Sequence, residues 1–172
     1  MMRNVLIILL TACLAALPVT AAQIPRPAPA LTFSLTNGKK IDLSSYKGKV
    51  IALEFLLTTC PHCQAASGSM QRIYSDYAAK GFQPLGVAID EEARRNLPTF
   101  IAGLNLSYPV GVGTHEMAIA FLQHSPVMIM NMPQLVIIDR KGQIRAQYDG
   151  MDDFFRNGEA NLRKLVDKLL TE

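Results

Sequence analysis

The chain has 172 residues, 49% of them hydrophobic and 18% charged, and a formal net charge of +3 at pH 7. This length allows one domain with a sizeable core and argues against a second domain. The small positive charge is dispersed along the chain, so nucleic acid is not expected as a partner.

The N-terminal residues 1–21 have the pattern of a secretory signal peptide. They contain a single charge at Arg3, an apolar stretch over residues 5–17, and small residues before Ala21. We predict cleavage after Ala21, which would place the domain outside the cytoplasm, in the periplasm or secreted. Two alternatives stay open. Lipid could be attached to Cys13, because residues 10–13 match a bacterial lipobox, or residues 5–22 could remain as a membrane anchor.

The next segments predict a linker, a hairpin and a buried strand. Residues 22–30 carry three prolines, which favours an extended, solvated linker before a domain over residues 31–172. Apolar residues alternate from 31 to 43 around Asn37-Gly38, a pattern typical of a β-hairpin. Residues 50–57 are nearly all apolar, which predicts a central strand buried on both faces.

Two cysteines follow this strand, in Cys60-Pro61-His62-Cys63. On a loop that opens a helix, the first thiol lies where unpaired backbone N–H groups stabilise an anion, so Cys60 is expected to be the nucleophilic thiolate. Pro61 suits the first helical position, and a protonated His62 would stabilise the thiolate further. Cys63, one turn along and facing inward, would be the resolving thiol. If Cys13 belongs to the signal, no odd thiol remains in the exported domain.

A purely structural disulfide and a zinc site are the alternatives for this pair. A disulfide between residues three apart closes too small a loop to constrain much of the unfolded chain. Zinc normally needs four ligands, and His115 and His124 stand alone without a second ligand pair. A redox role is therefore favoured.

The remaining pattern alternates strands and helices. It predicts a helix from the cysteines to Lys80, a strand over 82–89, a helix over 96–103, a short strand over 108–112 and a short helix over 116–122. A hairpin over 134–148 and a final helix capped by Asn157 complete the chain. This order describes an α/β sandwich with a mixed sheet.

With these residues in place, the chain resembles the TlpA and ResA-like thiol-disulfide oxidoreductases, an extracytoplasmic branch of the thioredoxin superfamily within the redoxin group. The resemblance rests on Gly48-Lys49 before the central strand, on the cysteine motif, and on Pro133 followed by residues 135–139 and Gly142. It implies a thioredoxin-like α/β fold, with a mixed central sheet flanked by helices and an N-terminal β-hairpin. It also implies that the family's cis-proline is Pro133 and that the Met132 backbone faces a bound substrate chain.

The activity implied by the resemblance is exchange of the Cys60-Cys63 disulfide with cysteines of other proteins through a mixed disulfide. No cofactor is required. The expected partners are protein dithiol or disulfide substrates and a membrane or periplasmic redox partner, and the protein is expected to be a monomer. The dipeptide Pro61-His62 is similar to that of the oxidase DsbA, so the direction of exchange stays open.

Two departures from the family concern the region around the cysteines. The chain has no Trp, and Leu56 and Thr59 stand where relatives usually carry aromatic residues. Glu54 matches the buried acid of thioredoxins proper, which implies a proton relay beneath Cys63. The alternative is that Glu54 lies at a polar rim or pairs with a basic side chain.

Two other functions compete with disulfide exchange. A thiol peroxidase of the redoxin group would need Thr and Pro before its reactive cysteine, where this chain has Leu57 and Leu53. A Sco-like Cu(I) carrier is the second, because Met128, Met130 and Met132 have strand spacing near His124 and the dithiol. Sco proteins, however, space their cysteines one residue wider, and alternating methionines are usually core residues.

Overall fold

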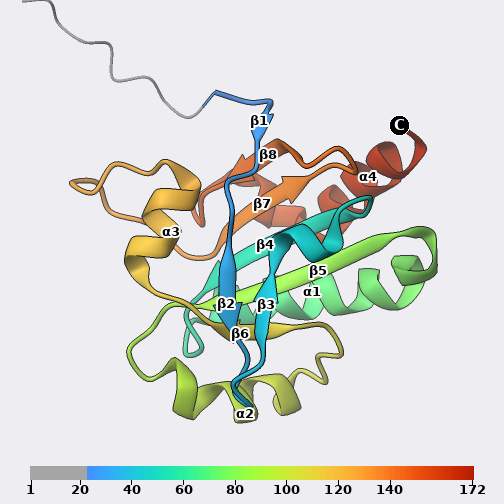
Figure 1. The fold of residues 1–172 in the computed structure, drawn as a ribbon. Helices are drawn as coiled ribbons and strands as arrows, with labels where there is room; N and C mark the ends of the chain where they lie inside the picture. The colour runs from blue at the N-terminus through green and yellow to red at the C-terminus, as the bar shows by residue number, and fades with distance from the viewer. Residues whose placement is uncertain (1–22) are drawn as a thin grey trace, which may run out of the picture.

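The computed structural model describes residues 23–172, so the predicted signal peptide lies outside the described residues. An eight-stranded mixed sheet, in the order β1-β8-β7-β4-β5-β6-β2-β3, has helices on both faces (Figure 1). The strands are β1 (Arg26–Pro27), β2 (Thr32–Ser34), β3 (Lys40–Asp42), β4 (Val50–Leu56), β5 (Phe82–Ala88), β6 (Val110–Val112), β7 (Gln134–Ile138) and β8 (Gln143–Tyr148). The helices are α1 (Pro61–Tyr77), α2 (Ala93–Gly103), α3 (His115–Leu122) and α4 (Gly158–Thr171), with 3-10 turns η1 (Leu43–Tyr46), η2 (Ala78–Lys80) and η3 (Asp153–Asn157). The predicted thioredoxin-like α/β fold is confirmed.

Strand β4 lies at the centre of the sheet, parallel to β5 and antiparallel to β7, and all seven of its residues are buried. Successive side chains of a strand point to opposite faces. Ala52 and Leu56 accordingly belong to one core cluster, and Leu53 and Phe55 to the other. The same alternation places Glu54 on the face of Ala52 and Leu56.

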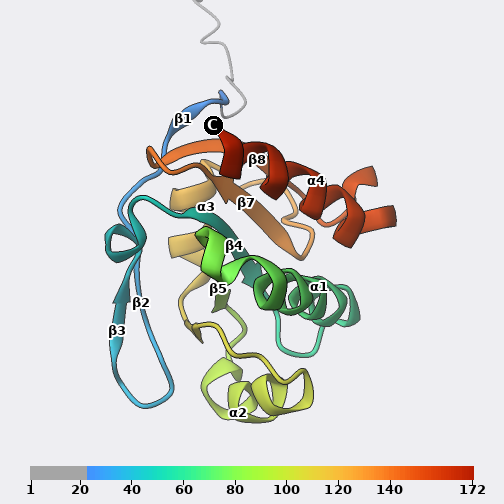
Figure 2. The ribbon, with the colours of Figure 1, turned by 90° about the vertical axis from the view of Figure 1, so that its right-hand side faces the viewer.

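The two core clusters correspond to the two faces of the sheet. Helices α1, α2 and α4 contribute to the first cluster, while α3 and the β2–β3 hairpin contribute to the second. Figure 2 shows α1 and α4 side by side on one face and α3 on the other. Glu54 therefore lies beneath the helix that starts at the cysteine motif.

The predicted hairpin is present as antiparallel β2 and β3, with Gly38 in the left-handed region at φ 85°. The position of the hairpin depends on a tertiary contact, because β2 pairs with β6 through Ser34 and Val112 and so extends the sheet. Glycine at position 38 fits the turn, since left-handed backbone is unfavourable for residues with a Cβ.

The proline-rich segment differs from the expected solvated linker. Arg26 and Pro27 form β1 and pair with β8, and the Arg26 side chain is buried, donating to the Phe121 carbonyl at 3.1 Å and to Gln147 Oε1 at 3.0 Å. An edge strand needs backbone hydrogen bonds on one side only, so it tolerates prolines that a central strand would not. The domain therefore includes residues before position 31.

Smaller differences concern helix ends and membrane spans. Helix α2 begins at Ala93, before the predicted residue 96, and Asn157 precedes α4 without a hydrogen bond from its side chain to the helix. Within residues 23–172, no helix is long and apolar enough to cross a membrane.

Candidate active site

The dithiol lies at the start of α1, where the sequence predicted it. Cys60 is the N-cap residue, with extended backbone, and its Sγ accepts a hydrogen bond from the Cys63 N–H at 3.3 Å. Pro61 occupies the first helical position, and the Cys60 carbonyl accepts the first intrahelical bond from the Gln64 N–H at 3.0 Å. This geometry gives a sulfur anion at Cys60 both a direct donor and the positive end of the helix dipole.

The two thiols have different environments. Both are reduced, Cys60 is partly exposed, and Cys63 is completely buried. Burial raises the pKa of Cys63 far above its usual range, and its hydrogen bond with Cys60 and the nearby Glu54 carboxylate act in the same direction. Cys63 is therefore a neutral thiol in this state, and a base must remove its proton before it can attack a disulfide.

Glu54 is fully buried on β4, on the sheet face covered by α1. Its Oε2 accepts a hydrogen bond from Ser67 Oγ at 2.6 Å, and Oε1 has no partner among the described residues. Burial raises the pKa of Glu54 from 4.5 to about 8, although the Ser67 hydrogen bond lowers it. The alternative of a polar rim or a basic partner is therefore wrong for Glu54.

Ser67 and Tyr108 enclose this carboxyl group, and sequence reasoning missed both. Ser67 lies one turn after Cys63 on α1 and is completely buried. The Tyr108 hydroxyl donates to the Ser67 carbonyl at 3.2 Å, and burial, together with the charge of Glu54, raises the pKa of Tyr108. A serine at helical spacing from a cysteine is visible in the sequence, but its direction toward β4 is not.

The predicted cis-proline is present: the peptide bond between Met132 and Pro133 is cis. Strand β7 follows it and runs antiparallel to β4, with Gln134 opposite Phe55. The start of β7 thus reaches the end of β4, from which the chain leads to Cys60. Met132 and Cys60 both pack against the first core cluster.

A hydrogen-bond network around Asp149 holds the backbone before this proline. The Asp149 carboxylate accepts from Asn131 Nδ2 at 3.1 Å, from Gln134 Nε2 at 2.8 Å and from the Met151 N–H at 3.0 Å. Burial raises the pKa of Asp149, but these hydrogen bonds more than offset that effect and hold the pKa below its usual range. Asp149 therefore keeps a charge that anchors the loop.

Gly150 is a second residue of this region that the sequence did not single out. Its N–H donates to the Asn131 carbonyl at 3.2 Å, and a Cβ at position 150 would collide with the backbone of Met132. Position 150 therefore requires glycine, because the backbones of residues 150 and 132 approach too closely to leave room for a Cβ. The dipeptide Asp149-Gly150 is a turn signal in the sequence, but nothing there connects it to Met132.

His62 and Met132 line the same cleft, although they come from α1 and from the loop before β7. This cleft has a volume of about 470 Å³, and Asn131, Gly150, Met151, Asp152, Asp153, Phe155 and Arg156 complete its wall. The structure thus brings together the motif histidine and the predicted substrate-facing residue. Met151, in the wall of this cleft, is 78% exposed.

The methionines considered for copper do not lie on a strand. Residues 123–133 form a loop between α3 and β7, in which Met128 is exposed, whereas Met130 and Met132 pack against the core. Within residues 23–172, no group of three or more His, Cys, Asp or Glu side chains is arranged to hold a metal ion. The shared strand face that suggested a Cu(I) site is therefore absent.

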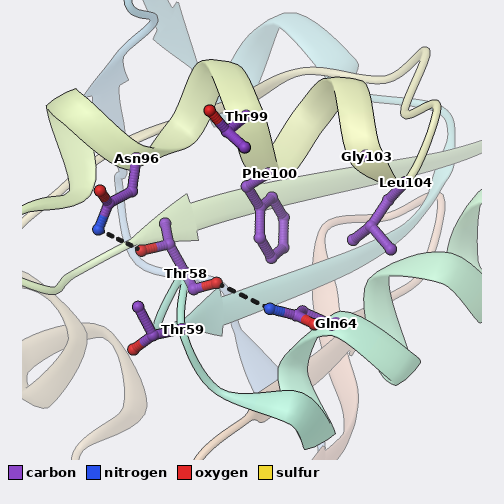
Figure 3. A pocket seen from close by; sticks show the side chains of 8 residues that line it. All are labelled: Thr58, Thr59, Gln64, Asn96, Thr99, Phe100, Gly103 and Leu104. Atoms are coloured by element: carbon purple, nitrogen blue, oxygen red, sulfur yellow. Dashed lines mark hydrogen bonds between the residues drawn. The ribbon is translucent and has the colours of Figure 1, made fainter.

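A second cleft lies on the other side of the motif and is centred on Thr58 (Figure 3). The Thr58 hydroxyl donates to Asp90 Oδ2 at 2.7 Å and accepts from Asn96 Nδ2 at 3.2 Å, while its carbonyl accepts from Gln64 Nε2 at 3.2 Å. These bonds tie the loop before Cys60 to both α1 and α2.

A reduced dithiol at the N-terminus of a helix, beside a cis-proline in a thioredoxin-like sheet, defines a thiol-disulfide redox protein. Comparisons with known proteins agree. A model of the AhpC/TSA family matches residues 24–147, so the chain belongs to that family. The oxidoreductase class and the ResA-like resemblance predicted from the sequence are confirmed.

Individual relatives are also named as thiol-disulfide oxidoreductases or interchange proteins. The chain is 29% identical over 130 residues to the thiol-disulfide oxidoreductase ResA of Bacillus thuringiensis strain Al Hakam, covering 74% of this chain and 70% of that protein. It is 26% identical over 117 residues to ResA of Bacillus subtilis strain 168, covering 68% and 62%. A thiol:disulfide interchange protein of Chlorobium tepidum TLS superposes with a TM-score of 0.72 at 27% identity, covering 87% of this chain and 99% of that structure.

Proposed function

We propose that this protein is an exported oxidoreductase that exchanges its Cys60-Cys63 pair with protein cysteines through a mixed disulfide on Cys60. The observation that carries the proposal is the difference between the two sulfurs. Cys60 is partly exposed and its sulfur accepts a hydrogen bond from the Cys63 N–H, whereas Cys63 is buried near Glu54. The first can meet a large substrate, and the second can act only within the protein.

In the reducing direction, the Cys60 thiolate attacks one sulfur of a substrate disulfide. A bond forms between Cys60 Sγ and that sulfur, the substrate disulfide breaks, and the other substrate sulfur leaves as a thiolate. Cys63 then loses its proton and attacks Cys60 Sγ. The Cys60-Cys63 disulfide forms, and the second substrate sulfur leaves as a thiolate. The reverse sequence oxidises a substrate dithiol.

Glu54 is the proposed base for Cys63 and returns the proton in the reverse direction. A group that both takes and gives a proton works best with a pKa near the working pH, and the pKa of Glu54 is about 8. The unpartnered Oε1 leaves one carboxylate oxygen available for the proton. His62 is the proposed source of positive charge beside the Cys60 thiolate.

The cleft between His62 and Met132 is the proposed substrate site, with the backbone of Met132 and Pro133 against the substrate chain. The predicted signal peptide supports export, which would supply disulfide-containing partners. We propose that the protein acts as a monomer, without a cofactor, and that a membrane or periplasmic redox partner restores its starting state.

The test compares Cys60→Ser with Cys63→Ser in the reduced full-length protein. The Cys63→Ser variant should attack a disulfide substrate and accumulate a covalent adduct on Cys60, because only resolution is lost. The Cys60→Ser variant should form none on the peptide that contains positions 60 and 63. Adducts on this peptide, which excludes Cys13, are counted by peptide mass spectrometry without reductant. Equal amounts in the two variants would contradict the assigned roles.

A further inference from the structure

The motif lies between two clefts, and the proposed exchange uses only one of them. Thr59, immediately before Cys60, lines the cleft around Thr58, whereas His62, two residues after Cys60, lines the cleft with Met132. A chain bound through its sulfur to Cys60 therefore has a cleft on each side of the attachment point.

The Thr58 cleft has a volume of about 560 Å³, within the range of about 300–1,000 Å³ that is common for small-ligand sites. Its floor is apolar, formed by Phe100 and Leu104, and its walls carry amide and hydroxyl groups from Thr58, Thr59, Gln64, Asn96 and Thr99. None of the lining side chains is charged. Asp90, behind the wall, uses both carboxylate oxygens on Thr58.

The two amide side chains are held in place, which leaves their oxygens free to bind. Asn96 donates to Thr58 Oγ1, and Gln64 donates to the Thr58 carbonyl. Within residues 23–172, neither amide oxygen accepts a hydrogen bond. Figure 3 shows Asn96 on α2 and Gln64 on α1, with Thr58 between them. The cleft thus offers fixed acceptors above an apolar floor.

We propose that this cleft binds an uncharged, hydrogen-bonding residue, such as Gln or Asn, close to the cysteine of the substrate chain. The inference rests on the proposed exchange at Cys60. An amide side chain donates two N–H groups to the acceptors in the wall and packs its methylene groups on the apolar floor. A carboxylate has no N–H to donate to these two amide oxygens, and an alanine would reach neither wall.

Gly103 allows the cleft to be filled without disturbing its walls. It is the last residue of α2, lines the cleft, and has nothing within 4 Å of the position that a Cβ would take. Gly103→Leu therefore places an apolar side chain at the cleft. Ala102→Leu adds the same side chain at an exposed neighbouring position that does not line the cleft, so it is the matched control.

The experiment follows adduct formation on Cys60 in the reduced Cys63→Ser protein, with and without either leucine substitution. The probes are symmetrical disulfides of three blocked pentapeptides with a central cysteine, flanked on both sides by Gln, Ala or Glu, and hydroxyethyl disulfide as a probe without side chains. In each case Cys60 thiolate bonds to one probe sulfur and the other half leaves as a thiolate.

The Gln peptide should react about fivefold faster than the Ala and Glu peptides, as expected for one or two added hydrogen bonds. Gly103→Leu should remove this preference, whereas Ala102→Leu should keep it, and neither should change the rate with hydroxyethyl disulfide. Equal rates for the three peptides, or a preference that survives Gly103→Leu, would overturn the proposed site. Failure of hydroxyethyl disulfide to form any adduct would instead refute the exchange function itself.

Discussion

Replacing Glu54 with Gln should change how the stability of the protein depends on pH. The pKa of this buried carboxyl group is about 8 in the folded protein and 4.5 as a reference for the unfolded chain. Between these values the folded state holds a proton that the unfolded chain has released. The stability contributed by this proton is complete below pH 4.5 and is lost as the pH rises through 8.

The magnitude follows from one titrating proton. The free energy of unfolding of the wild-type protein should fall, relative to Glu54→Gln, by about 1.4 kcal/mol per pH unit, or about 4 kcal/mol from pH 5 to pH 8. Glutamine keeps the size of the side chain and can still bond to the Ser67 hydroxyl, so the comparison isolates the ionisable group. The variant should therefore be the more stable protein at pH 8.

Urea denaturation of both reduced proteins, at intervals from pH 5 to pH 8, measures this difference. The upper limit stays below the ordinary thiol pKa of about 8.5, and the cysteines are the same in both proteins. Glu91→Gln is the control, because Glu91 is an exposed carboxylate of the same type, and its curve should run parallel to wild type. Parallel curves for wild type and Glu54→Gln would refute the buried, protonated carboxyl group and the proton relay that depends on it.

Three further substitutions test the surroundings of the dithiol. Gly150→Ala forces a Cβ against the backbone of Met132 and should slow exchange with peptide disulfides by roughly 10-fold to 100-fold. The control is Gly68→Ala, whose Cβ would meet only the Arg72 side chain at 3.5 Å and should not slow exchange. Equal rates for Gly150→Ala and wild type would show that the loop before the cis-proline does not position substrate. Ser67→Ala removes a hydrogen bond that lowers the pKa of Glu54, so the pH dependence of the rate of mixed-disulfide resolution should move to higher pH. An unchanged pH dependence would contradict the proton relay. His62→Gln removes a potential positive charge beside the thiolate and should lower the reduction potential by about 10–30 mV in a glutathione titration, with an unchanged potential as the contrary result.

Local pattern was sufficient for most secondary structure and for the position of the two cysteines at the start of a helix. Three features depend only on residues that are neighbours in the sequence: the buried strand β4, the turn at Asn37-Gly38, and the helix start at Cys60-Pro61. The conformational preferences of these residues determine structure within a single turn, strand or helix end. The cis peptide at Pro133 came from the family resemblance, since its sequence neighbours do not distinguish it from a trans proline at the start of a strand.

Contacts between distant segments decided the rest. The sequence left open whether Glu54 was buried or paired, and the answer depends on Ser67 and Tyr108, which lie 13 residues from Glu54 and 41 residues from Ser67 respectively. Gly150 matters only because β7 and β8 bring it against Met132. Arg26 lies in the sheet because β1 pairs with the edge strand β8, a contact between segments more than 100 residues apart in the sequence. Propensity and periodicity describe a segment by itself, whereas these roles come from packing between segments, which depends on how the sheet orders its strands.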